Sequence, residues 1–172
     1  MRSEATSAPV LRVLGVDPGL NLTGYGVLEL RGRQIALCEA GVVRGRARGS
    51  LPHRLLEIHR GLTEVISALA PQVVALEELY SHYARPRTAI LMGHARGVLC
   101  LAAAAAGLEV ANYSATQVKR ILTGSGRASK GQVQRAILHE LGLARLPEPP
   151  DVADALAIAL CHCYLGGKPR LG

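Results

Sequence analysis

The fold is indicated first by residues 10–19, VLRVLGVDPG, an apolar run that ends on the carboxylate Asp17 immediately before a Pro-Gly pair. Short apolar runs that are rich in Val and Leu and stop at such a pair are typical of buried β-strands. A similar run over residues 72–77 also ends on a carboxylate, Glu77. The sequence therefore predicts two buried strands that each carry an acid at the carboxyl end.

The residues between these two runs predict a β-meander and one helix. Strands are expected over residues 24–30 and 33–43, and the tight Arg-Gly turn between them makes an antiparallel pair. From Ser50 onward the apolar residues fall at helical spacing, and Pro71 ends the expected helix.

The rest of the chain predicts mainly helices. A polar loop over residues 81–88 is followed by an expected helix over 89–106, a strand over 109–112, and helices over 114–122, 129–141 and 151 to about 165. Serines stand at several of the expected helix starts, and Gly or Pro residues follow several of the ends. This order indicates an α/β fold, with a mixed five-stranded sheet of three antiparallel strands and then two parallel ones, flanked by helices.

The length and composition favour one compact domain. The chain has 172 residues, of which 49% are hydrophobic, enough for a single core. We expect a domain over residues 10–165, a disordered leader over 1–9 and a flexible tail over 166–172. The longest apolar run, residues 97–107, is about half of the roughly 20 residues that a membrane span needs, so no membrane helix is expected. The first residues lack the apolar stretch of a secretory signal, which predicts a cytoplasmic protein.

Charge and cysteine usage narrow the class of partner. The formal net charge of +7, from 20 Lys and Arg against 13 Asp and Glu, favours a polyanionic partner without identifying one. The four cysteines form no CxxC pair, and Cys161 and Cys163 lie in an apolar helical run, so free thiols are expected rather than a zinc site or disulfides. His94 and His162 also lie in apolar helical contexts and are expected to pack rather than to bind a ligand.

Two further acids, Asp151 and Asp154, lie three residues apart at the start of the last expected helix. This spacing places them on the same side of its first turns. If the strands that end at Asp17 and Glu77 are neighbours, all four acids converge at one edge of the sheet. Clustered carboxylates repel one another unless a cation or a raised pKa compensates, and hard oxygen ligands suit Mg²⁺ or Mn²⁺. The pattern therefore predicts a metal site.

Each acid also has a purely structural explanation. Asp151 alone is more simply a helix cap, and Asp17 before Pro-Gly is a common turn residue. Glu77 is followed by Glu78, as at a solvated strand end. Asp154 is the hardest to explain in this way, because it interrupts an apolar helix in which a lone buried carboxylate is unfavourable without a partner.

Several short motifs extend from about residue 11 to 165, nearly the whole chain. They are Gly15-Val16-Asp17-Pro18-Gly19, Thr23-Gly24-Tyr25-Gly26, Ala75-Leu76-Glu77-Glu78-Leu79-Tyr80, Ala95-Arg96-Gly97, Gln117-Val118-Lys119 and Asp151-Val152-Ala153-Asp154-Ala155-Leu156-Ala157. In this order they resemble the RuvC family of Holliday-junction resolvases, part of the ribonuclease H-like superfamily. The last motif is the most specific of them, whereas the Asp-Pro-Gly opening is shared with other ribonuclease H-like proteins.

The resemblance implies a ribonuclease H-like fold and a homodimeric endonuclease that resolves four-way DNA junctions in homologous recombination and DNA repair, together with a branch-migration motor of the RuvA and RuvB type. It further implies two Mg²⁺ ions per subunit, or Mn²⁺, held by Asp17, Glu77, Asp151 and Asp154. Two ions about 4 Å apart would activate a water for in-line attack and stabilise the leaving 3′ oxygen, giving 5′-phosphate and 3′-hydroxyl ends. The two-fold symmetry of a dimer would place paired nicks in strands of like polarity.

The resemblance also assigns residues to DNA binding. Lys119 and Lys130 match basic positions that face DNA, and Tyr80 stands in the junction loop where the family commonly has Phe. The tyrosines and arginines after Glu77 make this loop aromatic and basic, a combination that suits nucleic acid, although a solvated surface charge is the simpler explanation for either lysine taken alone. The residues expected to contact DNA are Tyr80, Tyr83, Arg85, Arg87, Lys119, Arg127 and Lys130.

Three other functions fit parts of the sequence. Residues 17–24 also resemble the phosphate loop of actin-like ATPases and sugar kinases, but those enzymes close two such domains around a nucleotide. A non-catalytic DNA-binding module would use the basic residues and leave the acids structural. A nuclease of the same fold could instead prefer other branched or RNA-containing substrates.

Overall fold

The computed structural model describes residues 9–45, 48–79 and 86–165. Within these residues five strands form one mixed sheet in the order β3-β2-β1-β4-β5. The pairs β1·β2 and β2·β3 are antiparallel, and β1·β4 and β4·β5 are parallel. The predicted mixed sheet is confirmed. The strands are β1 (Val10–Asp17), β2 (Leu22–Arg31), β3 (Gln34–Arg44), β4 (Val73–Glu77) and β5 (Glu109–Tyr113).

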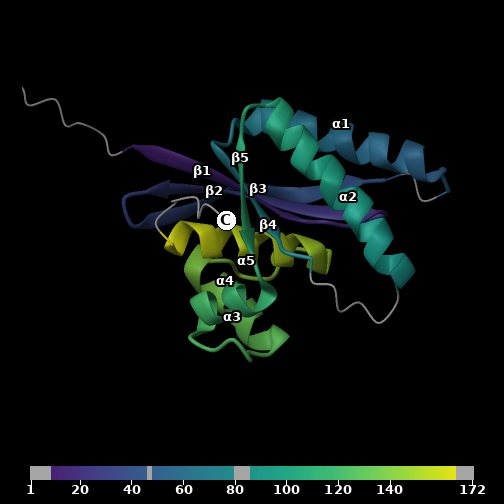
Figure 1. Ribbon diagram of the computed structural model, residues 1–172. Coiled ribbons are helices and arrows are strands. Elements are labelled where there is room, and N and C mark those ends of the chain that lie inside the picture. Colours follow the sequence, from purple (N-terminus) through teal and green to yellow (C-terminus); the bar gives the residue numbers. More distant parts are fainter. Residues whose placement is uncertain (1–8, 46–47, 80–85, 166–172) are drawn as a thin grey trace, which may run out of the picture.

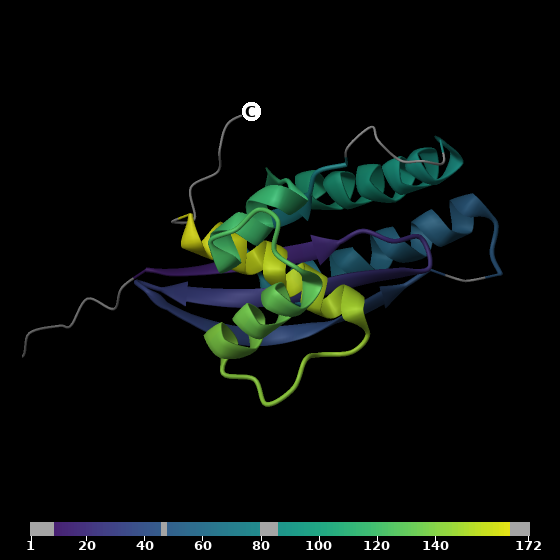
Figure 2. The ribbon, with the colours of Figure 1, turned by 90° about the horizontal axis from the view of Figure 1, so that it is seen from below.

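Helices cover both faces of this sheet (Figures 1 and 2). The helices α1 and α2 lie on one face, and α5 lies on the other with α3 and α4 outside it. One difference from the sequence prediction is that α2 starts at Pro86, so Arg87 lies in its first turn and not in a loop. The helices are α1 (Leu51–Leu69), α2 (Pro86–Ala105), α3 (Ala115–Thr123), α4 (Lys130–Leu141) and α5 (Pro150–Tyr164).

The sheet register brings the two strand-end acids together. Val16 is the Cα partner of Leu76 in the parallel pair β1·β4. Asp17 and Glu77 are the next residues of these strands, so they leave neighbouring strands at the same level of the same sheet edge. The expectation that these two strands are neighbours is therefore confirmed.

Three glycines allow α5 to pack directly on β1 and β2. A Cβ atom at Gly15 would stand 2.2 Å from the carbonyl oxygen of Ala155, and one at Gly26 would stand 2.4 Å from a methyl carbon of Leu156. At Gly24 it would stand 2.1 Å from the carbonyl oxygen of Asp151. Because no side chain separates α5 from the strands here, the helix start lies against the sheet edge where β1 ends.

The helix α5 is buried around most of its circumference, since it lies between the sheet and the outer helices. Its residues from Val152 to Cys163 are buried except for Asp154. His162 is fully buried, and its Nδ1 lies 2.6 Å from the hydroxyl of Tyr113 on β5, so its predicted packing role is confirmed. The packing role predicted for His94 is wrong, because this residue is exposed on α2. All four cysteines are free thiols, as expected.

Among the described residues, α2 is long and apolar enough to cross a membrane by length and composition alone. The sequence prediction of no such helix considered only the apolar run at residues 97–107. It was wrong about the length of the helix, which starts eleven residues earlier. Core helices pass the same test. The buried side of α2, which includes Ala95, Leu99 and Ala103, packs in the apolar cluster between the sheet and α1.

Candidate functional site

Four carboxylates come from three elements at one edge of the sheet. Asp17 ends β1, Glu77 ends β4, and Asp151 and Asp154 occupy the first two turns of α5. All four residues are half-buried. The prediction that the Asp154 carboxylate is buried is therefore wrong, because this side chain keeps 46% of its surface exposed.

The electrostatics of Asp17 link the four acids. Burial, together with the negative charges of Asp154, Glu77 and Asp151, raises the pKa of Asp17 to about 7, against a smaller opposing effect of Lys130. Burial and the charge of Asp154 also raise the pKa of Glu77, while Lys119 lowers it. Carboxylates that raise one another's pKa form a site that favours a cation.

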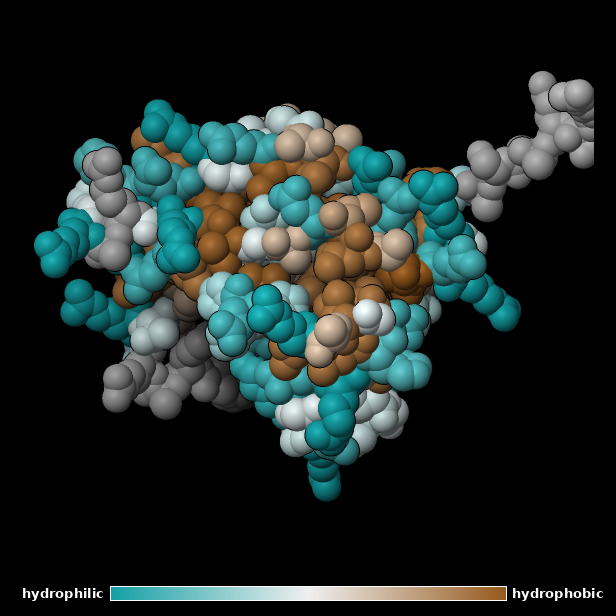
Figure 3. Space-filling model, turned by 180° about the vertical axis from the view of Figure 1, so that it is seen from behind, coloured by the Kyte–Doolittle hydropathy of each residue, from teal (hydrophilic) through white to brown (hydrophobic). Residues whose placement is uncertain are grey.

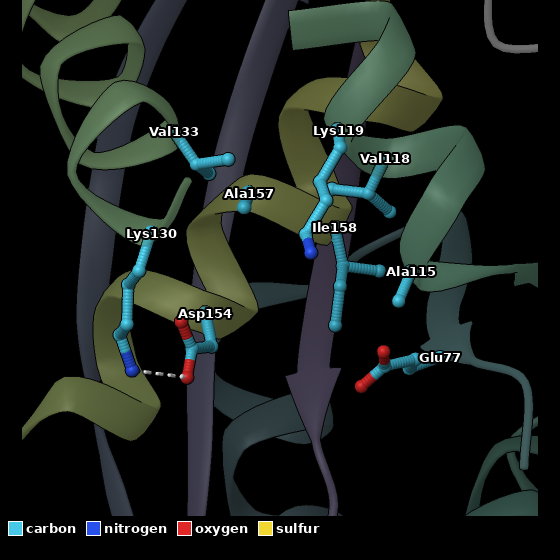
Figure 4. Close-up of a pocket in the computed structure, with 9 residues that line it drawn as sticks. All are labelled: Glu77, Ala115, Val118, Lys119, Lys130, Val133, Asp154, Ala157 and Ile158. Atoms are coloured by element: carbon cyan, nitrogen blue, oxygen red, sulfur yellow. Dashed lines mark hydrogen bonds and ion pairs between the residues drawn. The ribbon is translucent and has the colours of Figure 1, made fainter. Parts of the chain in front are cut away.

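A cavity of about 260 Å³ opens beside these acids (Figure 4). Glu77 and Asp154 face it from its two sides, and Lys119 of α3 and Lys130 at the start of α4 reach toward the same space. Two basic residues that the sequence assigned to DNA binding, Lys119 and Lys130, therefore lie beside two of the predicted acids. The lining residues are Glu77, Ala115, Val118, Lys119, Lys130, Val133, Asp154, Ala157 and Ile158.

Lys130 forms an ion pair with Asp154, and its Nζ lies 3.4 Å from Oδ2. Their side chains are 60% and 46% exposed, so the pair contributes at most about 1 kcal/mol to stability. Such a weak pair separates readily when a stronger partner approaches either group. Lys130 is therefore available for an anion and Asp154 for a cation.

The turn after Asp17 is fixed by a buried threonine. The hydroxyl of Thr23 donates to the carbonyl of Gly19 at 2.8 Å and accepts from its backbone N–H at 3.3 Å. Thr23 is fully buried, so these bonds are shielded from water. The loop that follows the predicted catalytic carboxylate is consequently held in one conformation.

Arg96 of α2 supports Glu77, a role that the sequence analysis did not assign. Its Nε donates to the backbone carbonyl of Glu77 at 3.3 Å, and its Nη2 donates to Oδ1 of Asn112 on β5. One guanidinium thus holds the ends of β4 and β5 together beside the acidic edge. The sequence carried a signal for it, because Arg96 is the charged residue of the Ala-Arg-Gly motif.

Of the remaining residues predicted to bind DNA, the structure describes two, Arg87 and Arg127. Arg87 is exposed in the first turn of α2, and Arg127 is exposed in the turn before α4. Tyr80, Tyr83 and Arg85 lie outside the described residues.

The donor set fits a hard divalent ion, since it offers only carboxylate oxygens and a shared electrostatic preference for a cation. In the side-chain positions of the described residues, no three His, Cys, Asp or Glu side chains come close enough together to hold a metal ion. The carboxylate of Asp154 is directed to Lys130 instead. Ion binding would therefore require side-chain rotation, with the backbone positions of the acids already set.

Comparison with known proteins identifies close relatives. The family model described as crossover junction endodeoxyribonuclease RuvC matches residues 13–162. A crossover junction endodeoxyribonuclease RuvC from Rhodopirellula baltica is 57% identical over 157 residues, which are 91% of this chain and 88% of that protein.

Solved structures agree with this result. The structure of Thermus thermophilus RuvC in complex with a Holliday junction substrate matches with a TM-score of 0.85 at 36% identity, over 91% of this chain and 94% of that one. The yeast mitochondrial Holliday junction resolvase matches with a TM-score of 0.66 at 15% identity, over 95% of this chain and 82% of that one, and supports the fold alone.

Proposed function

The chain belongs to the RuvC family of crossover junction endodeoxyribonucleases, and we propose that it cleaves four-way (Holliday) DNA junctions. The observation that carries the proposal is the meeting of Asp17, Glu77, Asp151 and Asp154 at one sheet edge beside two lysines. Acids and bases gathered in this way suit hydrolysis of a phosphodiester, because the acids favour cations and the lysines favour phosphate.

We propose that the four acids hold two Mg²⁺ ions per subunit, with Mn²⁺ as an alternative. When bound, such ions lower the pKa of the attacking water and neutralise charge on the scissile phosphate and the leaving 3′ oxygen. Asp17 is the central acid, since the other three all act on its pKa. Arg96 keeps Glu77 in position through the backbone of β4. Cleavage leaves 5′-phosphate and 3′-hydroxyl ends.

Lys119 and Lys130 are the proposed phosphate contacts nearest to the acids. Both line the cavity, and Lys130 stands at the start of α4, where the helix dipole adds to its positive charge. Arg87 and Arg127, both exposed, are proposed to contact the DNA further out. Tyr80, Tyr83 and Arg85 are proposed for the same interface on the sequence resemblance alone.

A homodimer gives the paired nicks that resolution of a junction requires. The outer face of α2 supports this part of the proposal. Ile90 and Leu101 are 62% and 60% exposed on this helix, and a Cβ atom at Gly93 or Gly97 would meet nothing within 4 Å. An apolar helix face with glycines in it allows close approach of a second copy. Replacing Leu101 with Arg should convert the dimer to a monomer in sedimentation equilibrium, and an unchanged mass would place the interface elsewhere.

The cellular setting follows from the family. We propose that the protein acts in homologous recombination and DNA repair in the cytoplasm, in cooperation with a branch-migration motor of the RuvA and RuvB type.

The decisive experiment is cleavage of a synthetic four-way junction by the purified protein, with Mg²⁺ and with EDTA. The variants Asp17→Asn, Glu77→Gln and Asp154→Asn should each lose cleavage by about a hundredfold or more while they still bind the junction. The matched control is Glu78→Gln, which removes an exposed acid next to Glu77 and should cleave as the wild type does.

Two results would contradict the proposal. Cleavage at the wild-type rate by Asp17→Asn in Mg²⁺ would show that the acids are structural and that the metal site lies elsewhere. Equal cleavage of a junction, a linear duplex and an RNA–DNA hybrid would show a nuclease of this fold with another substrate.

A further inference from the structure

The segment that joins β3 to α1 is strongly basic. Residues 40–56 carry four arginines and neither Asp nor Glu. Arg44 at the end of β3 and Arg48 after it are both exposed, on either side of residues 46–47, as is His53 in the first turn of α1. Figure 3 shows hydrophilic side chains gathered at the left of the view, the side of the molecule on which β3 ends and α1 begins. We call Arg44, Arg48 and His53 the arginine corner.

The arginine corner lies at the same sheet edge as the acids. In the sheet register Asp17 is opposite Gly24, and Gly24 is opposite Val42. Arg44 is therefore two strands across from Asp17 and two residues further along, which corresponds to about 10 Å sideways and about 7 Å outward. The two Cα atoms are thus about 12 Å apart by this geometry. The backbone of Arg44 therefore lies beyond the level at which Asp17 ends its strand.

The arginine corner is held rigidly to the loop that follows Asp17. The backbone N–H of Gly45 donates to the carbonyl of Asn21 at 3.1 Å. The guanidinium of Arg54 on α1 donates to the side-chain oxygen of the same residue, Asn21. These bonds join the end of β3, the start of α1 and the loop 18–21, so the corner keeps a fixed relation to the acids.

The surroundings of the corner favour an anion. The first turn of α1 has no acidic residue and its N-cap Ser50 makes no side-chain cap bond, so the positive end of the helix dipole is not neutralised there. The nearest acids along the chain are Glu39, which accepts a hydrogen bond from Tyr25, and Glu57, which is half-buried one turn into the helix. Arg44 lines a hollow together with Glu57 and Glu64 of α1, so part of its charge is balanced there, whereas Arg48 adds exposed positive charge beside the start of α1.

The two basic groups lie on opposite sides of the acids. Lys119 and Lys130 belong to α3 and α4, on the α5 face of the sheet, whereas the arginine corner lies toward α1 on the other face (Figures 1 and 2). A DNA strand whose scissile phosphate is at Asp17 can therefore meet lysines on one side and arginines on the other. Successive phosphates of one strand advance about 3.4 Å along the helix axis and lie further apart than this in space because they wind around it, so a separation of about 12 Å spans about two nucleotides.

We propose that the arginine corner binds the phosphate backbone of a duplex arm of the junction, about two nucleotides from the cleaved phosphate. The proposal rests on the proposed function and adds a second binding surface to it. The corner supplies affinity and fixes the path of the arm. It takes no part in the chemistry.

The test is the salt dependence of binding to a four-way junction in EDTA, measured by fluorescence anisotropy. The double variant Arg44→Ala/Arg48→Ala should bind roughly tenfold more weakly. The slope of log Kd against log salt should fall by about 2, because each lost phosphate contact removes about 0.9. Arg44→Lys/Arg48→Lys should keep the wild-type slope, since it retains both charges.

The matched control is Arg31→Ala/Arg33→Ala, which removes two exposed arginines from the hairpin turn at the opposite end of the sheet. For this control, the slope of log Kd against log salt should change by less than half of the change expected for Arg44→Ala/Arg48→Ala. A second readout uses junctions with one neutral methylphosphonate linkage. Neutralising the linkage about two nucleotides from the scissile phosphate should weaken binding by the wild type and leave binding by the double variant unchanged.

The outcomes separate the two proposals. A wild type that cuts junctions, with a double variant that shows the same slope or a loss no larger than that of the control, overturns the arginine corner and leaves the proposed function intact. A wild type that neither binds nor cuts junctions overturns both.

Discussion

Gly24 of β2 lies directly against Asp151 of α5, and a Cβ atom at Gly24 would stand 2.1 Å from the backbone carbonyl oxygen of Asp151. This contact places the start of α5 at the level where Asp17 ends β1, since Gly24 is the register partner of Asp17. A glycine that carries no chemistry therefore determines how close the helix acids come to the strand acids.

We predict that Gly24→Ala both destabilises the protein and reduces cleavage. The added methyl group overlaps backbone atoms that cannot rotate away, so α5 must shift, at a cost of about 1–3 kcal/mol. Chemical denaturation and junction cleavage would measure the two effects. Gly131→Ala on α4 is the stability control, because its nearest contact would be an ordinary 3.6 Å to a flexible Arg135 side chain. Wild-type cleavage by Gly24→Ala would show that the close approach is unimportant for the site.

Replacing Arg96 should affect turnover more than DNA binding. Arg96 contacts the Glu77 backbone and Asn112, so Arg96→Gln releases the end of β4 without removing a proposed phosphate contact. Loss of such a supporting group typically weakens metal affinity or activity 10- to 100-fold, and we expect about that drop in kcat with little change in KM.

Magnesium titration of the cleavage rate distinguishes this positioning role from misfolding. Arg96→Gln should need more Mg²⁺ for half-maximal rate while it unfolds cooperatively at a similar denaturant concentration. Asn112→Asp is the conservative control, because it keeps an oxygen acceptor for the guanidinium. An unchanged Mg²⁺ requirement would remove Arg96 from the support of Glu77.

Lys130→Met should reduce cleavage with little effect on stability. The pair that Lys130 makes with Asp154 is exposed and contributes at most about 1 kcal/mol, whereas its proposed phosphate contact is lost entirely. Thermal unfolding and kcat/KM on the junction would be compared with Arg135→Met, which removes an exposed charge from the same helix. Equal kcat/KM for the two variants would contradict a specific role for Lys130.

The raised pKa of Asp17 predicts a pH-dependent stability difference. An unfolded Asp ionises near pH 4, while the folded protein holds the proton on Asp17 until about pH 7. The folded state therefore loses stability relative to the unfolded chain as pH rises through this window, and the loss is complete above it. Asp17→Asn removes this penalty.

In EDTA at pH 8, Asp17→Asn should consequently unfold at a higher temperature than the wild type, and its free energy of unfolding should be higher by up to about 4 kcal/mol. The difference between the two proteins should be smallest at or below pH 4. Differential scanning calorimetry at the two pH values measures this. Mg²⁺ should stabilise the wild type at pH 8 more than the variant. A difference that is the same at both pH values would mean that Asp17 ionises normally.

The sequence by itself determined the elements and the chemistry of the candidate site. The periods of apolar residues predicted the strands and helices, because a strand buries every second residue and a helix buries one face. The positions of Asp17 and Glu77 at strand ends, and of Asp154 within an apolar helix, indicate an acidic site from the sequence alone. The start of α2 and the exposure of His94 were predicted wrongly where the local pattern is weak, and the half-exposed side chain of Asp154 was missed within a strongly apolar helix.

Only the tertiary structure decided which residues meet. The close approach of α5 to the sheet depends on Gly15, Gly24 and Gly26, because a side chain at any of them would overlap atoms of the helix. The sequence around each glycine does not show which element packs against it. The contacts of Arg96 with Glu77 and of Arg54 with Asn21 join segments 19 and 33 residues apart, and the long flexible arginine could have reached other acceptors. Strand order and helix packing select among such partners, because they follow from burial of the whole core and not from any one segment.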